Sequence, residues 1–354
     1  MTVKVGVVGA AGFAGVELVR LLTEHPEFEL CVITSNAEAG IALSEIYPAF
    51  VGKTDLVFSS HNDPLLFECS AVFLAVPHTA ALKQVPALLE RGIDVFDLSA
   101  DYRLKDAAVY ESWYGATHTS PELLLRAAFG LPELFADDLD RVHCDHEAGR
   151  AVLVACAGCY PTATSLAAYP AIHAGMLRGN LVVDAISGIT GAGKSATART
   201  HYCNSDESVE AYGVGKHRHT PEIEQILGLA NRVIFTPHLA PFKRGLLSTV
   251  YIPLSPDAAQ HFSADALHRL YTDFYAESAF VRVLASGAMP KTMSVAGSNV
   301  CQIGLSLHEP TSTLIAVAAI DNLCKGAAGQ AVQCANVTYG FPETAGLTKM
   351  ALPV

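Results

Sequence analysis

A glycine-rich turn near the start of the chain constrains the fold more than any other feature. The apolar run Val3–Val8 predicts a strand, and Gly9, Gly12 and Gly15 follow it before a helical pattern over 16–22. In doubly wound α/β folds such a turn holds a dinucleotide pyrophosphate against free N–H groups of the helix start. One glycine stands at a different position from that in the usual dinucleotide-binding fingerprint. A tight turn that serves only packing would have a similar sequence. We interpret the turn as a cofactor site formed by Gly9, Gly12, Phe13 and Gly15.

The end of the second expected strand bears on which dinucleotide binds. NAD-binding folds usually carry an acidic residue about 20 residues after the glycines, where it holds the ribose hydroxyls. Here the run Leu30–Thr34 ends at Ser35 and Asn36, and the missing carboxylate leaves room for the phosphate of NADP. No Lys or Arg lies between residues 20 and 53 to neutralise that phosphate, and Glu38 is nearby. The sequence therefore favours NADP(H) over NAD, with Ser35 as a further cofactor contact.

The remaining apolar runs predict two domains. Runs at 71–76 and 95–98 alternate with segments that can form helices, a pattern typical of a Rossmann-type domain with a parallel sheet. Beyond residue 150 longer runs at 181–186, 233–235, 247–254 and 314–320 predict an α+β domain with a mixed sheet. The helical segment 327–337 is expected to return to the first domain. The expected domains are a dinucleotide-binding domain (1–157 and 325–354) and a catalytic and oligomerisation domain (158–324).

Composition excludes several classes of protein. The net charge is −12 with no basic run, which argues against a nucleic-acid surface and leaves an anionic ligand to a few local cations. No apolar run is long enough to span a membrane, and the start lacks a signal-peptide pattern, so we expect a cytoplasmic protein. The nine cysteines are odd in number and irregularly spaced, which argues against a secreted disulfide framework.

Cys159 is the candidate nucleophile. An apolar strand over 152–156 leads into a turn of small residues and then a helical segment over 163–169. A cysteine at a helix start gains thiolate character from the helix dipole. A thiolate can attack an activated carbonyl and hold the product as a thioester that is open to hydride reduction.

A group of basic residues supplies candidate acid/base and anion-binding side chains. Lys216, His217, Arg218 and His219 are consecutive and stand just before an expected helix in an otherwise acidic chain. On an extended segment His217 and His219 would share one face. The alternative is a solvated turn, which would be the better explanation of a single histidine. We expect either histidine to act as the acid/base, and Lys216 and Arg218 to bind the substrate.

Residues 157–162, Ala-Gly-Cys-Tyr-Pro-Thr, resemble the Pro-Gly-Cys-Tyr-Pro-Thr motif of the N-acetyl-gamma-glutamyl-phosphate reductase family. Cys156 and Ala157 replace the more common Asn and Pro, and Asn36 stands where many relatives have an Arg. Similar agreement covers nearly the whole chain, at 97–103, 187–194, 217–222, 235–239 and 321–329.

The resemblance implies an enzyme of arginine biosynthesis. Cys159 would attack the acyl phosphate and release inorganic phosphate, and hydride from NADPH would then give N-acetylglutamate semialdehyde while a histidine protonates the departing thiolate. Arg103 would contact the phosphate. Ser187, Gly188 and Asn322 would lie near the cofactor or the substrate, as would Lys325. A homodimer or homotetramer is expected, since the mixed sheet could expose an apolar face for a symmetric partner.

Four other interpretations stay open at this stage. Residues 188–195 fit the phosphate loop of ATP-dependent kinases, although the polar stretch after them is not typical of the helix that such a loop needs. His143, Cys144 and His146 with the Cys156-x-x-Cys159 pair could bind zinc, but a metal would occupy the nucleophile, and we predict no metal. A disulfide between Cys156 and Cys159 is also conceivable. The related acyl-phosphate reductases, aspartate-semialdehyde dehydrogenase and the carrier-linked aminoadipyl- or glutamyl-phosphate reductases, share the chemistry.

Overall fold

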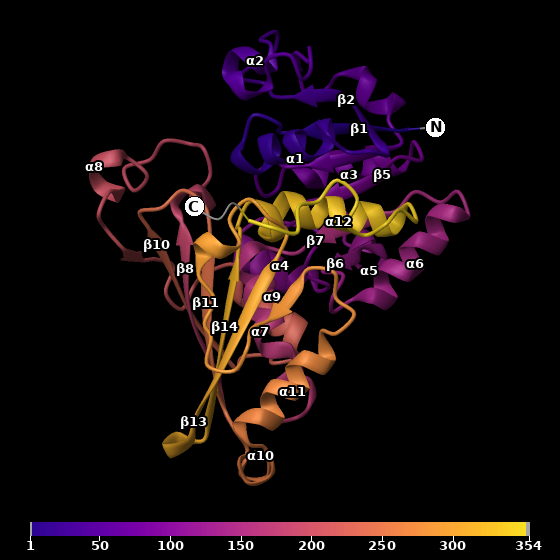
Figure 1. Ribbon diagram of the computed structural model, residues 1–354. Helices are drawn as coiled ribbons and strands as arrows, with labels where there is room; N and C mark the ends of the chain where they lie inside the picture. Colours follow the sequence, from indigo (N-terminus) through magenta and orange to yellow (C-terminus); the bar gives the residue numbers. More distant parts are fainter. Residues whose placement is uncertain (1, 352–354) are drawn as a thin grey trace. The chain divides into compact units, whose positions relative to one another are not determined.

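The computed structural model describes residues 2–351, which form two compact units (Figure 1). Among these residues, the first unit comprises 2–157 together with 327–347, and the second comprises 158–326 and 348–351. The expected boundaries differ at 325–326 and at 348–351, which belong to the second unit. Gly326 N–H donates to the carbonyl of Asp321 (2.9 Å), and Asn299 N–H donates to that of Thr348 (2.9 Å). Local hydrogen bonds therefore tie both segments to the second unit.

The first unit contains a seven-stranded parallel sheet in the order β3-β2-β1-β4-β5-β7-β6. Its strands are β1 (Val3–Val8), β2 (Phe28–Thr34), β3 (Phe58–Ser59), β4 (Ala71–Leu74), β5 (Asp94–Asp97), β6 (Ala128–Gly130) and β7 (Leu153–Cys156). The order reverses between β1 and β4, and the crevice at the carboxyl ends of two such strands is where doubly wound sheets bind ligands. The expected parallel α/β sheet is confirmed.

Helices cover both faces of this sheet because its strands are apolar on both sides. Alternate residues of β4 face the two cores on opposite sides of the sheet. Val72 and Leu74 pack with α3, whereas Phe73 stacks on Phe96 and contacts Phe28 edge-on. Within the first unit α12 packs beside α1 and α6 (Figure 1). The helices are α1 (Phe13–Thr23), α2 (Leu43–Ile46), α3 (Ala81–Leu89), α4 (Ala107–Tyr114), α5 (Glu122–Arg126), α6 (Ala136–Glu147) and α12 (Gly329–Thr338). The segment after β14 thus returns to the first unit, as expected for residues 327–337.

The second unit contains a mixed seven-stranded sheet in the order β12-β13-β14-β11-β8-β10-β9. Its strands are β8 (Leu181–Gly188), β9 (Glu210–Ala211), β10 (Val233–Ala240), β11 (Leu246–Pro253), β12 (Val281–Val283), β13 (Cys301–His308) and β14 (Thr313–Ile320). β8 and β10 are parallel, whereas β11 runs antiparallel to both β8 and β14. The mixed sheet is confirmed, although β9, β12 and β13 had not been predicted.

One face of the second sheet is covered by helices. In β8 and β11 every second side chain is buried, and α7 packs beneath β11 and β14 with α9 and α11 beside it (Figure 1). The helices are α7 (Cys159–His173), α8 (Tyr202–Ser205), α9 (Thr220–Leu227), α10 (Pro256–His261) and α11 (Ala264–Phe274). The intervening side chains of β8, β11 and β14 are partly exposed, and many are apolar: Val182, Ile186, Leu247, Tyr251, Ile315 and Val317. We call these six residues the outer face of the sheet.

Candidate active site

The glycine turn in the first unit has a geometry that larger residues could not adopt. Gly9 lies in the left-handed region (φ +81°), and a Cβ there would be 2.3 Å from the carbonyl oxygen of Ala75. A Cβ on Gly15 would lie 2.2 Å from the carbonyl oxygen of Gly9. Gly12 is the N-cap of α1, and Phe13 is its first residue. The backbone N–H groups at the start of α1 therefore stand at the crevice beside β1, where an anionic pyrophosphate fits.

The end of β2 is polar and includes a carboxylate. The Ser35 side chain is buried and its hydroxyl donates to Glu38. Asn36 Oδ1 accepts the backbone N–H of His61 (2.9 Å), and burial lowers the pKa of His61. Just after β2, a serine hydroxyl is thus hydrogen-bonded to a carboxylate, whereas the sequence had shown only that Glu38 lies near Ser35 along the chain.

Cys159 lies at the first position of α7, directly after the N-cap Gly158. The first turn of this 15-residue helix carries no acidic residue of its own, so the positive end of the helix dipole acts on the thiol. A Cβ on Gly326 would lie only 2.7 Å from the Cβ of Cys159, so the chain packs closely behind the nucleophile. These features favour a thiolate held in one orientation.

The two histidines lie together beside Tyr160, the residue after Cys159. Their ring centroids are 4.9 Å apart, and those of His217 and His219 lie 5.6 and 6.0 Å from that of Tyr160. The segment is a turn, not the extended strand assumed from the sequence, because His219 has helical angles and caps α9. Burial, followed by the charge of Arg218, lowers the pKa of His217 to about 4. His217 is therefore neutral near pH 7.

Two tyrosines complete this pocket wall. Tyr160 donates its hydroxyl hydrogen bond to the carbonyl of His238 (3.0 Å), and Tyr212 donates to the Tyr160 hydroxyl (3.3 Å). Burial raises the pKa of Tyr160, and it raises that of Tyr212 to about 12. Negative charge on Cys159 contributes to both shifts, which places the thiol within electrostatic reach of the two hydroxyls. Neither tyrosine had been singled out from the sequence for this role.

Asn322 joins two loops at the carboxyl end of β8. Its Oδ1 accepts the N–H of Gly245 (2.8 Å), and its Nδ2 donates to Thr190 Oγ1 (3.0 Å). Ser187 is buried one residue before Gly188, where a Cβ would lie 2.7 Å from the carbonyl oxygen of Phe242. Ser187, Gly188 and Asn322 thus lie in one cluster at the carboxyl end of β8.

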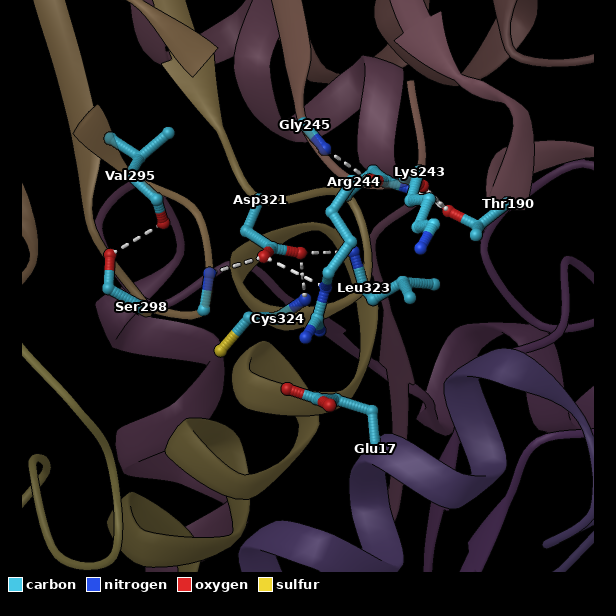
Figure 2. A network of polar contacts seen from close by, with 12 residues as sticks. Glu17, Thr190, Lys243, Arg244, Gly245, Val295, Ser298, Asp321, Leu323 and Cys324 are labelled. Atoms are coloured by element: carbon cyan, nitrogen blue, oxygen red, sulfur yellow. Dashed lines mark hydrogen bonds and ion pairs between the residues drawn. The ribbon is translucent and has the colours of Figure 1, made fainter. Parts of the chain in front are cut away.

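Asp321 anchors the chain next to that cluster. Its buried carboxylate accepts the N–H groups of Gly297 (2.6 Å), Leu323 (2.8 Å) and Cys324 (3.1 Å) and pairs with Arg244 Nε (3.1 Å). Figure 2 shows this carboxylate between the Arg244 side chain and the backbone that leads into Cys324. The following π-helix, Cys324–Ala328, contains the fully buried Lys325 and Gly326. Asp321 had been quoted only as part of a motif, with no role.

The candidate substrate cations differ in exposure. Lys216 and Arg218 are exposed beside the histidines of the second unit. Arg103, in the first unit, is only 5% exposed and donates to the backbone carbonyls of Cys156 (2.7 Å) and Leu98 (2.6 Å). Arg103 therefore holds the end of β7 as well as offering a cation.

The phosphate-loop interpretation fails on local structure. β8 ends at Gly188, and a short 3-10 turn (Ile189–Ala192) follows instead of the long helix that binds phosphate in kinases. Residues 193–201 form no helix, and α8 has four residues.

The zinc interpretation also lacks support in residues 2–351. His143 contacts the carbonyl of Thr338 (3.0 Å), and His146 pairs with Asp94 (2.9 Å). No group of three or more potential ligands gathers in this part of the chain, and its nine cysteines form no disulfide.

Comparison with known proteins identifies the family. Residues 4–142 match the family described as semialdehyde dehydrogenase, NAD binding domain, and residues 159–322 match semialdehyde dehydrogenase, dimerisation domain. Proteins named N-acetyl-gamma-glutamyl-phosphate reductase match at 44% identity in Desulfotalea psychrophila and 45% in Desulforudis audaxviator, each with 98% of both chains covered. The chain belongs to the N-acetyl-gamma-glutamyl-phosphate reductase family. The expected resemblance is thereby confirmed.

Solved structures of other semialdehyde dehydrogenases share the fold of this reductase family member. Aspartate semialdehyde dehydrogenase II from Vibrio cholerae has a TM-score of 0.72 at 14% identity, with 95% of this chain and 98% of that one covered. A structure of aspartate semialdehyde dehydrogenase with NADP from Candida albicans has a TM-score of 0.70 at 17% identity, with the same coverage. At such identities the likeness concerns the fold. No helix within residues 2–351 of this reductase family member is long and apolar enough to cross a bilayer.

Proposed function

We propose that this chain catalyses the NADPH-dependent reduction of N-acetyl-gamma-glutamyl phosphate to N-acetyl-L-glutamate 5-semialdehyde in arginine biosynthesis, with Cys159 as its nucleophile. Relatives that match nearly the full length of this chain are named as the enzyme of this reaction. The observation that carries the proposal is the place of Cys159 at the first position of α7, directly before Tyr160, whose ring contacts those of both histidines. The thiolate attacks the acyl carbon, the acyl–phosphate bond breaks, and inorganic phosphate leaves a thioester on Cys159.

We assign the acid/base role to His219. The Nδ1 atom of His217 lies 3.2 Å from the backbone N–H of His219, and at neutral pH it accepts that bond. The neutral ring then carries its proton on Nε2, while its Nδ1 holds the backbone of His219. His219, at the N-cap of α9, remains to take the thiol proton and to return it to the departing thiolate.

The glycine turn supports NADPH as the cofactor. Gly9, Gly12, Phe13 and Gly15 would hold the pyrophosphate and Ser35 the ribose end, with Ser187, Gly188 and Asn322 proposed as further contacts. Bound NADPH would supply the hydride that reduces the thioester. Lys216, Arg218 and Arg103 are the proposed contacts for the anionic groups of the substrate.

We also propose that the protein is a cytoplasmic homodimer or homotetramer. The match to a dimerisation domain covers the unit that contains the outer face of the mixed sheet. Six apolar side chains lie on three neighbouring strands, with Thr249 and Asp184 between them on the same face, and a second copy would cover this surface.

The test runs the reaction in reverse with the purified protein. N-acetylglutamate semialdehyde, phosphate and NADP should give NADPH absorbance at 340 nm, whereas omitting phosphate or substituting aspartate semialdehyde should abolish most of the signal. Cys159→Ser should lose nearly all turnover while it retains NADP binding, because a serine hydroxyl is far less ionised near neutral pH. No turnover with N-acetylglutamate semialdehyde, or wild-type turnover in Cys159→Ser, would contradict the proposal.

A further inference from the structure

Glu222 is a buried carboxylate immediately beside the nucleophile, and the reaction described above gives it no role. It stands at the third position of α9 and is only 1% exposed. Its Oε1 accepts the backbone N–H of Gly158, the N-cap of α7, at 2.8 Å. Gly158 precedes Cys159, so one hydrogen bond separates this carboxylate from the backbone of the nucleophile.

The bond to Glu222 gives a partner to a backbone N–H at the start of α7. The N–H of an N-cap residue has no partner within its helix, and the first turn of α7 carries no acidic residue that could reach back to it. A glutamate at the third helical position commonly reaches back to the N-cap N–H of its own helix. Here Glu222 bonds the N-cap of a different helix, and the N–H of His219, the N-cap of α9, is directed to His217 instead.

The same glutamate belongs to the element that carries the histidines. His219 immediately precedes α9 and accepts the N–H of Ile223 at 3.0 Å, so its backbone is fixed to the turn that holds Glu222. The bond from Glu222 to Gly158 therefore joins two segments that lie about sixty residues apart in the sequence. One segment carries the thiol and the other carries the proposed base.

We propose that Glu222 is a positioning residue, which sets the distance between Cys159 and His219 by holding the start of α7 against the start of α9. The inference rests on the proposed function for the roles of the two reacting residues. The buried carboxylate lies in the first turn of α9 and at the N-terminus of α7, and both helix dipoles favour a negative charge there. A full charge close to the thiol also disfavours the thiolate, so the hydrogen bond and the charge act in opposite directions.

Two variants of equal charge separate the effect of the hydrogen bond to Gly158 from that of the charge near the thiol. Glu222→Gln and Glu222→Ala both lack the charge, but only glutamine keeps an oxygen that can accept the Gly158 N–H. Glu222→Ala should lower kcat by at least about 50-fold with KM and NADP affinity changed less than about threefold, because misalignment of reacting groups by about 1 Å can cost about 100-fold. Glu222→Gln should remain within about fivefold of the wild type. Glu224→Gln, on the same helix but less buried, is the control and should match the wild type.

A second readout does not depend on turnover. The rate at which iodoacetamide alkylates Cys159, followed on its peptide by mass spectrometry, should be several-fold slower in Glu222→Ala than in Glu222→Gln. If the alanine variant does not fold, Glu222→Asp is compared with the wild type instead, since both carry the charge but a side chain shorter by one methylene loses its reach to Gly158. Equal kcat and equal alkylation rates in Glu222→Ala and Glu222→Gln, or in Glu222→Asp and the wild type, would overturn the proposal. Absent turnover in the wild type would instead count against the proposed function, and the alkylation comparison would still decide the role of Glu222.

Discussion

The position of the Cys159 side chain depends on Gly326, which has no Cβ atom. A Cβ at Gly326 would lie 2.7 Å from the Cβ of Cys159, 3.2 Å from its Cα and 3.3 Å from a methyl group of Ile320. The two nearest atoms belong to Cys159 itself and cannot yield without displacing the nucleophile, whereas the third is the terminal methyl group of the Ile320 side chain. The close approach of Gly326 therefore restricts the Cys159 side chain on one side, and the start of α7 fixes its backbone.

Gly326→Ala should accordingly displace the thiol. We expect kcat to fall by at least about 100-fold, because small displacements of a reacting group are costly, and the unfolding free energy to fall by about 1 to 3 kcal/mol from overpacking. The measurements are steady-state kinetics and urea unfolding. Unchanged kcat in a folded variant would mean that the segment after Asp321 can move aside without affecting the thiol.

His217 should make the protein sensitive to acid. Its folded pKa of about 4 lies below the usual value of 6.5, so between these values the unfolded chain binds one more proton than the folded chain. Stability is then lost as pH falls from about 6.5 to about 4, by about 2 to 3 kcal/mol. His217→Gln, which cannot be protonated, should show a smaller loss of unfolding free energy between pH 7 and pH 4.5 in urea titrations. His308→Gln, an exposed control, should follow the wild type.

Among the strands and helices, those with a strong local sequence pattern were the ones that the sequence predicted. β1, β8 and β11 are continuous apolar or alternating runs, and their sequence periods predicted them closely. β13 was missed because its sequence, CQIGLSLH, includes a glycine and polar residues that only pairing with β14 explains. The extended segment assumed for His217 and His219 is a turn because Pro221 and the capping geometry start α9 immediately after them.

The site residues divide in the same way. Cys159 and the glycine turn could be found from the sequence because a small-residue turn between a strand and a helix is a local pattern. Glu222 and Asp321 could not, since their roles come from bonds to Gly158 and Gly297 that connect distant segments. Their sequence positions alone gave no reason to separate them from surface carboxylates.

The loop after β2 should limit the preference for NADPH. Ser35, at the end of β2, donates its hydroxyl to Glu38, so a 2′-phosphate bound there would meet a carboxylate. Glu38→Gln should raise the ratio of kcat/KM for NADPH to that for NADH by about three- to tenfold, because it removes this repulsion. Glu29→Gln, an exposed carboxylate earlier on β2, serves as the matched control. An unchanged ratio in Glu38→Gln would place the ribose phosphate away from this loop.

At the scale of the whole molecule, the outer face of the second sheet raises the question of what covers it. Tyr251 on β11 stands in register with Ile315 on β14 and with Val182 on β8, and Leu247 stands opposite Ile186. A stable protein–protein interface commonly buries about 800 Å² on each partner, which a patch spanning several strands can supply. Symmetry places the same patch on both copies, so a residue near its centre would face the equivalent region of the partner.

Ile315→Asp should therefore dissociate the oligomer without unfolding the chain. The new carboxylate would be buried without a partner in the assembly, at a cost of several kcal/mol per interface, but would be solvated in a monomer. Light scattering at micromolar concentration should change from the mass of an oligomer to that of a 37.4 kDa chain. Val209→Asp introduces the same charge at a residue that is already exposed outside this face, and it should leave the mass unchanged. An Ile315→Asp protein that keeps the oligomer mass would show that a different surface mediates assembly, and the outer face would then need another explanation for its apolar side chains.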